Sequence, residues 1–151
     1  MKRLSSVKYS KFSQFSFLIG MFCLISLGCG GAEGQADLPE PVLEQIQTVI
    51  FEPACATSGC HDSGCTDCGN LDMSSAQLSF ENMVEKPVAN GIAKMNGWVN
   101  VKPGDPERSF LIRKLRGPGV GEGDAMPSNS ESLNEPYIEI LEEWITNGAA
   151  R

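Results

Sequence analysis

Residues 53–61 read "PACATSGCH" and contain two cysteines, Cys55 and Cys60, separated by four residues. His61 follows the second cysteine directly and is the one histidine in the chain. A cysteine pair with an adjacent histidine is typical of covalent haem attachment when two residues separate the cysteines. The two thiols then bond to the haem vinyl groups, and the histidine is an axial ligand of the iron. The wider spacing in this chain leaves that interpretation open beside two others.

Both other interpretations use Cys65 and Cys68, which follow in "GCTDCG". The first is a zinc site, because the chain then offers four cysteines and His61 within fourteen residues and structural zinc takes four ligands. Zinc fingers, however, usually separate their two ligand pairs by a longer loop. The second is a pair of disulfides, with three possible connectivities, as an oxidising compartment favours. That arrangement leaves His61 without a role.

The N-terminal segment predicts export. The first eleven residues carry four basic side chains and no acid, and the thirteen residues 15–27 are almost wholly apolar. Thirteen residues are too few for a membrane-spanning helix, which needs about 20. "SLGC", ending at Cys29, resembles a bacterial lipoprotein box, although Ser26 stands where that box prefers leucine. We expect a signal peptide over 1–28 and a lipid on Cys29, with a plain signal-peptidase cut nearby as the alternative.

Charge restricts the partners of the exported chain. Removal of the signal peptide takes away four basic residues and no acid, so the formal charge changes from −7 to −11. Such an acidic surface argues against nucleic-acid binding, which depends on Lys and Arg neutralising phosphates. It favours a protein partner with a basic patch. Most of the remaining positive charge lies between Lys102 and Arg116, either on a solvated helix face or at a site for acidic groups.

The rest of the sequence predicts an all-α domain over 39–151, after a flexible tether of small and polar residues over 29–38. Apolar residues recur at helical spacing, and no stretch shows the alternation of a strand. Ser74 with Gln77 forms a possible capping box, and Asp105 is a possible N-cap. Long glycine-rich loops connect the helices. We expect four short helices, at about 40–51, 75–85, 105–117 and 135–147.

A second iron ligand is predicted in the glycine-rich loop 117–132. Met126 lies there in "DAMPS", 65 residues after His61. A methionine thioether is the usual second axial ligand where a second histidine is lacking. Pro127 restricts the chain beside it and would help to aim the sulfur. Three other methionines compete: Met83 on an apolar helix face, Met73 at a loop–helix junction, and Met95 in a stretch without a clear period.

Taken in order, "IQTVIFEPACATSGCH", "GNLDMSS", "VKPGDPERSFLIRKLRG", "MP" and "IEILEEWITNGA" resemble the small cytochrome c-like domains of bacterial envelope lipoproteins. The resemblance covers about residues 45–149. It implies a cytochrome c-like fold whose C-terminal helix packs across the first helix. It also implies one covalent haem c, attached to Cys55 and Cys60, with His61 as the proximal and Met126 as the distal iron ligand.

These expectations describe a one-electron carrier tethered to the bacterial cell envelope, facing the periplasm or on the outer membrane, that exchanges electrons with a redox partner protein and is not itself an enzyme. Cys65 and Cys68 depart from the family pattern. We expect them to form a local disulfide, with a redox-active pair or a metal site as alternatives. The rival functions are a non-haem structural or interaction lipoprotein, and a five-coordinate haem sensor or small peroxidase that leaves Met126 unliganded.

Overall fold

Helices and the loops between them make up the described parts of the chain, residues 38–65, 68–128 and 131–151, in the computed structural model. Those ranges contain no strand, only isolated bridges such as the one between Val84 and Val101. The all-α prediction is therefore confirmed. The predicted signal peptide, Cys29 and nearly all of the tether lie outside the described residues. Among the described helices, none is long and apolar enough to cross a membrane.

The first helical run corresponds to the helix predicted at about 40–51. It consists of α1 (Leu43–Ile46), a π-helical turn η1 (Gln47–Phe51) and α2 (Glu52–Ala54). The Phe51 carbonyl accepts the N–H groups of both Cys55, at 2.8 Å, and Ala56, at 2.7 Å. The run therefore ends at Cys55, the first cysteine of the motif. Because Phe51 is buried in the core, these bonds hold the start of the cysteine-containing loop in place.

The helix α3 (Ala76–Met83) begins one residue later than the predicted capping box requires. Ser75, not Ser74, is the N-cap, and its Oγ accepts the N–H of Leu78 at 3.2 Å. The prediction of a Ser74 cap was wrong because Asp72 already holds that residue: its carboxylate accepts the Ser74 N–H at 2.9 Å. The turn made by Asp72 shifts the start of the helix by one position.

The helix predicted at 105–117 is divided in two. Asp105 is an N-cap as predicted, and its carboxylate accepts the N–H of Arg108 at 3.1 Å. The turn that it caps is the 3₁₀ helix η2 (Pro106–Arg108), and α5 (Phe110–Arg116) follows. Ser109 separates them in an extended conformation, with its hydroxyl donating to the Asp105 carbonyl at 2.9 Å.

One short helix, α4 (Gly91–Met95), was not predicted. Five residues are too few for a helical period to show in the sequence. The helix is set by a local cap instead, since the Asn90 side chain accepts the N–H of Ala93 at 2.9 Å. It lies in the segment Glu85–Val101, here called the excursion, whose two ends are bonded to each other. The Glu85 N–H donates to the Val101 carbonyl, and the Asn100 N–H donates to the Lys86 carbonyl.

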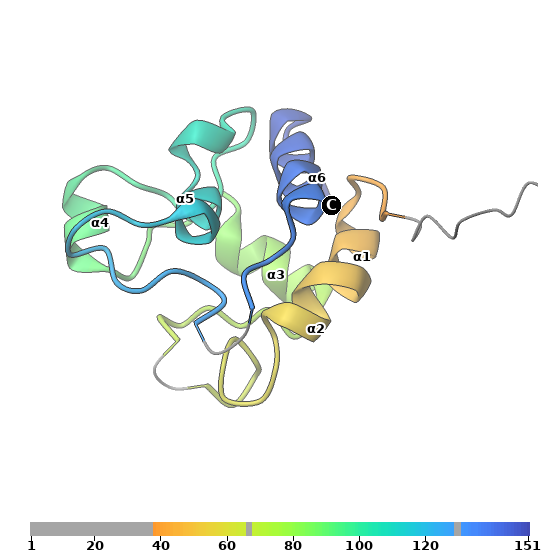
Figure 1. The fold of residues 1–151 in the computed structure, drawn as a ribbon, viewed down its shortest axis with the longest axis horizontal. Helices are drawn as coiled ribbons and strands as arrows, with labels where there is room; N and C mark the ends of the chain where they lie inside the picture. Colours follow the sequence, from red (N-terminus) through yellow and green to blue (C-terminus); the bar gives the residue numbers. More distant parts are fainter. Residues whose placement is uncertain (1–37, 66–67, 129–130) are drawn as a thin grey trace, which may run out of the picture. The chain divides into compact units, whose positions relative to one another are not determined.

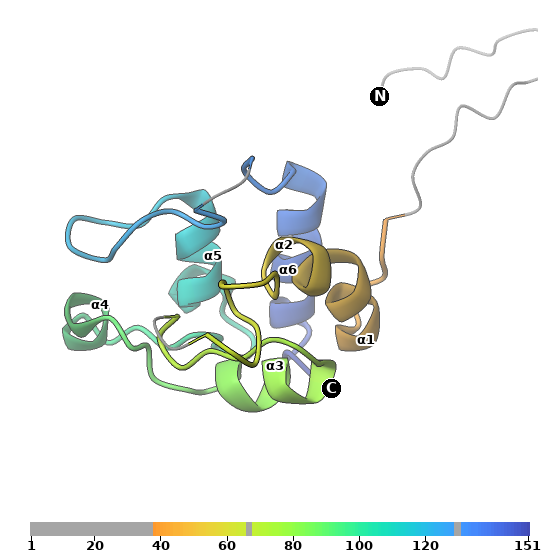
Figure 2. The same ribbon diagram turned by 90° about the horizontal axis from the view of Figure 1, so that it is seen from below.

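The main core lies where the first helical run, α3 and α6 (Glu135–Thr146) meet. In Figures 1 and 2, α6 lies between α5 and the α1–α2 run. Trp144 of α6 is 2% exposed and shares this core with Leu43, Ile46 and Ile50 of the first run. Its indole N–H donates to the Ala150 carbonyl at 2.8 Å, which holds the residues after α6 against the helix.

Candidate functional site

A cavity of about 560 Å³ opens between the cysteine-containing loop, α5 and the glycine-rich loop after α5. Ligand pockets in proteins commonly have volumes of about 300–1,000 Å³ and mostly apolar walls. Apolar side chains form most of the wall of this cavity, among them Leu71, Val88, Phe110, Leu111 and Leu115. All four residues predicted to hold haem also line it: Cys55, Cys60, His61 and Met126. The fold thus brings together two segments that are far apart in the sequence.

Backbone hydrogen bonds close the loop that carries the two cysteines. The Cys60 N–H donates to the Thr57 carbonyl at 2.9 Å, and the His61 N–H donates to the Cys55 carbonyl at 3.0 Å. Gly59 has φ 79°, the left-handed conformation that this tight turn needs and that glycine adopts without strain. Cys55 and Cys60 are free thiols, both half-buried. Burial, with a smaller contribution from Cys60, raises the pKa of the Cys55 thiol to about 12.

The imidazole of His61 is held by one hydrogen bond. Its Nδ1 lies 3.1 Å from the Leu71 carbonyl oxygen. In the tautomer that donates this bond, Nε2 keeps a lone pair for a metal. Burial is the main cause that lowers the His61 pKa, and the charge of Lys114 adds to it, while the bond to Leu71 opposes it. The lowered pKa favours the neutral form of the ring, which is the form that binds iron.

The segment behind His61 is fixed from the core. The Met73 N–H donates to the His61 carbonyl at 2.8 Å. The Met73 carbonyl in turn accepts the side-chain amide of the buried Gln47, at 2.8 Å, and Gln47 also accepts the hydroxyl of Ser79 at 2.7 Å. The π-helical turn η1, which carries Gln47, thus holds the histidine segment and α3 together.

Met126 lies on the part of the cavity wall that the glycine-rich loop after α5 forms. It is half-buried, its N–H donates to the Lys114 carbonyl at 2.9 Å, and its peptide bond to Pro127 is cis. Met73 and Met83 also reach the cavity, but both are buried in the core, as was predicted for Met83. Met95 is 77% exposed and does not line the cavity. Of the methionines that line the cavity, Met126 is therefore the one that belongs to a loop and not to the core.

Cys65 and Cys68 form a disulfide and also line the cavity. Zinc would need thiolates or other ligands gathered around one point. Within the described residues, no group of three or more His, Cys, Asp or Glu side chains is arranged to hold a metal ion. The geometry therefore lends no support to a zinc site.

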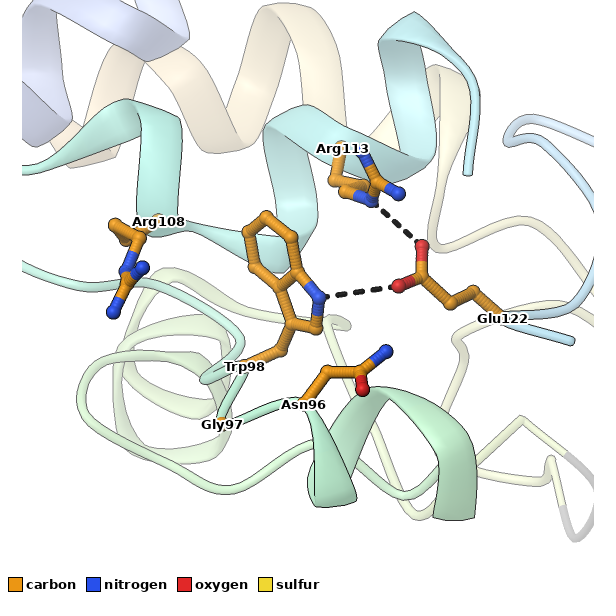
Figure 3. A pocket seen from close by; sticks show the side chains of 6 residues that line it. All are labelled: Asn96, Gly97, Trp98, Arg108, Arg113 and Glu122. Atoms are coloured by element: carbon orange, nitrogen blue, oxygen red, sulfur yellow. Dashed lines mark hydrogen bonds and ion pairs between the residues drawn. The ribbon is translucent and has the colours of Figure 1, made fainter. Parts of the chain in front are cut away.

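A second hollow has a volume of about 290 Å³, and Figure 3 shows the residues that line it. Sequence reasoning did not single out Glu122, which lines both hollows. Its carboxylate accepts the Trp98 indole N–H at 3.1 Å and the Arg113 Nε–H at 2.6 Å. The Arg113 side chain, followed by the Gly119 N–H, holds the pKa of Glu122 below its usual value. An acidic residue in a polar loop gives no sequence signal of such burial.

The basic residues between Lys102 and Arg116 are mostly paired within the domain. Arg113 is bound to Glu122, and Arg116 bridges α5 to Glu135 and Glu142 of α6. Lys114 lines the cavity, and its ammonium donates to the backbone carbonyls of Glu122 and Asp124. Burial lowers the pKa of Lys114, although Asp124 and Glu122 act in the opposite direction. Much of this charge therefore supports the loop that carries Met126.

No protein-family model matches the chain, and no curated protein or solved structure matches it either. The functional assignment therefore depends on the cavity and on the residues that line it.

Proposed function

We propose that residues 39–151 form a monohaem c-type cytochrome domain, which carries one electron at a time and is tethered to the bacterial cell envelope through a lipid on Cys29. One observation carries the proposal. A single, largely apolar cavity gathers the motif Cys55–Cys60–His61 and Met126, which lies 65 residues further along the chain. A non-haem lipoprotein with a zinc site or disulfides would not require a methionine at that wall, and neither would a five-coordinate haem protein.

The residues present fit a covalently attached haem c. Such a group needs two free thiols on one wall, a neutral imidazole directly behind them, and apolar surroundings that exclude water. Cys55 and Cys60 are unpaired on a closed loop, and the Leu71 carbonyl orients His61. When bound, haem c supplies an iron that accepts and releases one electron.

Each residue has a distinct task in this proposal. Cys55 and Cys60 anchor the porphyrin, so that the cofactor cannot dissociate. His61 offers Nε2 as the proximal ligand, and its ring is kept from rotating by the bond to Leu71. Met126 offers a thioether as the distal ligand, which raises the reduction potential relative to a second histidine. The apolar lining keeps water from the cofactor.

The domain so described transfers electrons and does not catalyse a reaction alone. Its donor and acceptor are redox proteins, and the acidic mature chain favours a basic patch on such a partner. The lipid on Cys29 would place the domain on the periplasmic side of the envelope or on the outer membrane.

The proposal is tested by the absorption spectrum of the full chain, produced in a host that matures c-type cytochromes. We expect sharp reduced α and β bands that survive extraction with acid and acetone. The double variant Cys55→Ala/Cys60→Ala should lose the covalent haem. The matched pair Cys65→Ser/Cys68→Ser removes two cysteines from the same loop and should keep it. A colourless wild-type protein, or equal haem content in both variants, would contradict the proposal.

A further inference from the structure

The glycine-rich loop that carries Met126 is fastened to the rest of the domain by one buried carboxylate. We propose that Glu122 is a positioning residue that holds Met126 in place as an iron ligand, an inference that rests on the proposed function. The side chain of Glu122 is 3% exposed, although it belongs to a loop of glycines and polar residues. Such burial of a carboxylate is unusual unless it is fully paired.

Donors from three segments of the chain converge on this carboxylate, the Asn96 side chain near Trp98 among them. Arg113 of α5 donates through Nε at 2.6 Å, and Trp98, which follows α4, donates through its indole N–H at 3.1 Å (Figure 3). The Gly119 N–H of the same loop donates at 2.6 Å. The Arg113 guanidinium also lies over the Trp98 ring, 5.1 Å from its centroid. Glu122 thus joins the loop to two separate elements.

A second set of bonds continues from Glu122 to Met126. The Lys114 ammonium donates to the carbonyls of Glu122, at 3.3 Å, and of Asp124. The Lys114 carbonyl accepts the Met126 N–H at 2.9 Å. Consecutive residues of α5 therefore hold the segment 122–126, Arg113 through the Glu122 carboxylate and Lys114 through the backbone as far as Met126. From the α4 side, Asn90 donates to the Gly121 carbonyl at 3.1 Å.

Glycine explains why the loop depends on these bonds. Gly121 and Gly123 have φ 80° and 82°, so the segment has the conformational freedom of glycine and cannot hold its own shape. A side chain at Gly119 would also collide with the Arg113 guanidinium. Replacing the Glu122 carboxylate by an amide turns one of its two acceptor oxygens into a donor, so that either the Arg113 or the Trp98 N–H, both half-buried, faces another donor. The loop should then release Met126 more often.

Exogenous imidazole measures how often Met126 is released. Imidazole binds the haem iron only when the distal position is free, so its apparent affinity rises with the fraction of molecules in which Met126 is displaced. In the haem-loaded protein, Glu122→Gln should raise the apparent affinity for imidazole at least about tenfold, because hydrogen bonds to a charged group are lost. It should also weaken the sulfur–iron charge-transfer band and lower the reduction potential.

The matched control is Glu142→Gln. Glu142 of α6 accepts two hydrogen bonds from Arg116, on the same helix α5, but it does not contact the glycine-rich loop. Its substitution should leave the imidazole affinity within about twofold of wild type, because a pair this exposed contributes little. Equal effects of the two substitutions would overturn the positioning role.

A second variant keeps the test decisive if Glu122→Gln does not fold. Trp98→Phe keeps an aromatic ring beside Phe110 and Arg113 and removes one of the donors to Glu122. We expect a smaller rise in imidazole affinity, about threefold, because a single neutral hydrogen bond is lost. Unchanged affinity in both folded variants would overturn this inference alone. A colourless wild-type protein would overturn the proposed function, and this inference with it.

Discussion

Met126, the proposed distal ligand, is the site residue whose role can be tested most directly. Met126→Ala should abolish the sulfur–iron charge-transfer band and lower the reduction potential, because the thioether stabilises ferrous iron. Covalent haem should remain, since Cys55 and Cys60 lie on a different segment. Spectroscopy and potentiometry of the purified variant check both expectations. Met95→Ala is the control, because Met95 is 77% exposed and lies away from the cavity; loss of the band there too would contradict the assignment.

The buried thiol of Cys55 gives a prediction for the haem-free polypeptide. Its raised pKa, about 12 against an ordinary 9.0, keeps the thiol protonated at pH 9, where half of an ordinary thiol is thiolate. Since the thiolate is the nucleophile, alkylation of Cys55 should be about 10²–10³-fold slower in the folded than in the denatured chain. Iodoacetamide labelling followed by mass spectrometry measures both rates. Similar rates in the two states would show that Cys55 is not buried.

At the scale of single residues, the sequence suggested the proposed haem-binding residues but not the residues that support them. A cysteine pair, an adjacent histidine and a methionine in a polar loop are recognisable because those residue types are unusual in their surroundings. Glu122 carries no such mark, because acids are ordinary in exposed loops. Its burial depends on Trp98 and Arg113, which reach it only after the chain has folded.

At the scale of elements, the N-terminus of α3 gives different roles to two neighbouring serines. Ser75→Ala should destabilise the domain by about 1 kcal/mol, because the helix loses its N-cap acceptor. Ser74→Ala should cost less than about 0.5 kcal/mol, because Ser74 is exposed and Asp72 still accepts the backbone N–H of residue 74 after the bond from the Ser74 hydroxyl is lost. Urea denaturation of both variants checks the difference. The opposite order would restore the capping box that the sequence suggests.

Helices with a complete apolar face were predictable, and those set by single contacts were not. The first helical run and α6 repeat their buried residues over several turns, so the period is visible in the sequence. The helix α4 has five residues and depends on the Asn90 cap. The break between η2 and α5 depends on the hydroxyl of Ser109, which bonds to the Asp105 carbonyl. Such contacts leave no periodic pattern.

For the whole molecule, the cavity connects cofactor binding with stability. The cavity of about 560 Å³ lies between the loops, and the proposed haem would add contacts on its walls. Covalent loading should raise Tm by at least about 10 °C, since each kcal/mol shifts Tm by roughly 4–8 °C in a domain of this size. Calorimetry of the loaded protein and of the Cys55→Ala/Cys60→Ala variant measures the shift. Equal Tm values would indicate that the cavity is not where haem lies.

The arrangement of the whole domain was only partly accessible from the sequence. Periodicity indicated which helix faces are apolar, and thus that Trp144 belongs to the core. It did not indicate that the loop after α5 folds back toward α4, a contact that rests on Asn90 and Gly121. Contacts between residues far apart in the sequence form only when the chain folds, so no local sequence pattern indicates them.

The closed excursion between Glu85 and Val101 has a consequence for how such a domain could diversify. Its two ends are joined by backbone bonds, and the start of α5 bonds to it as well, because the Phe110 N–H donates to the Val99 carbonyl. Two residues of the excursion, Asn90 and Trp98, contact the loop that carries Met126. If the domain holds haem as proposed, substitutions at Asn90 or Trp98 would therefore adjust the redox properties of the site through this loop, while the four proposed haem-binding residues stay the same.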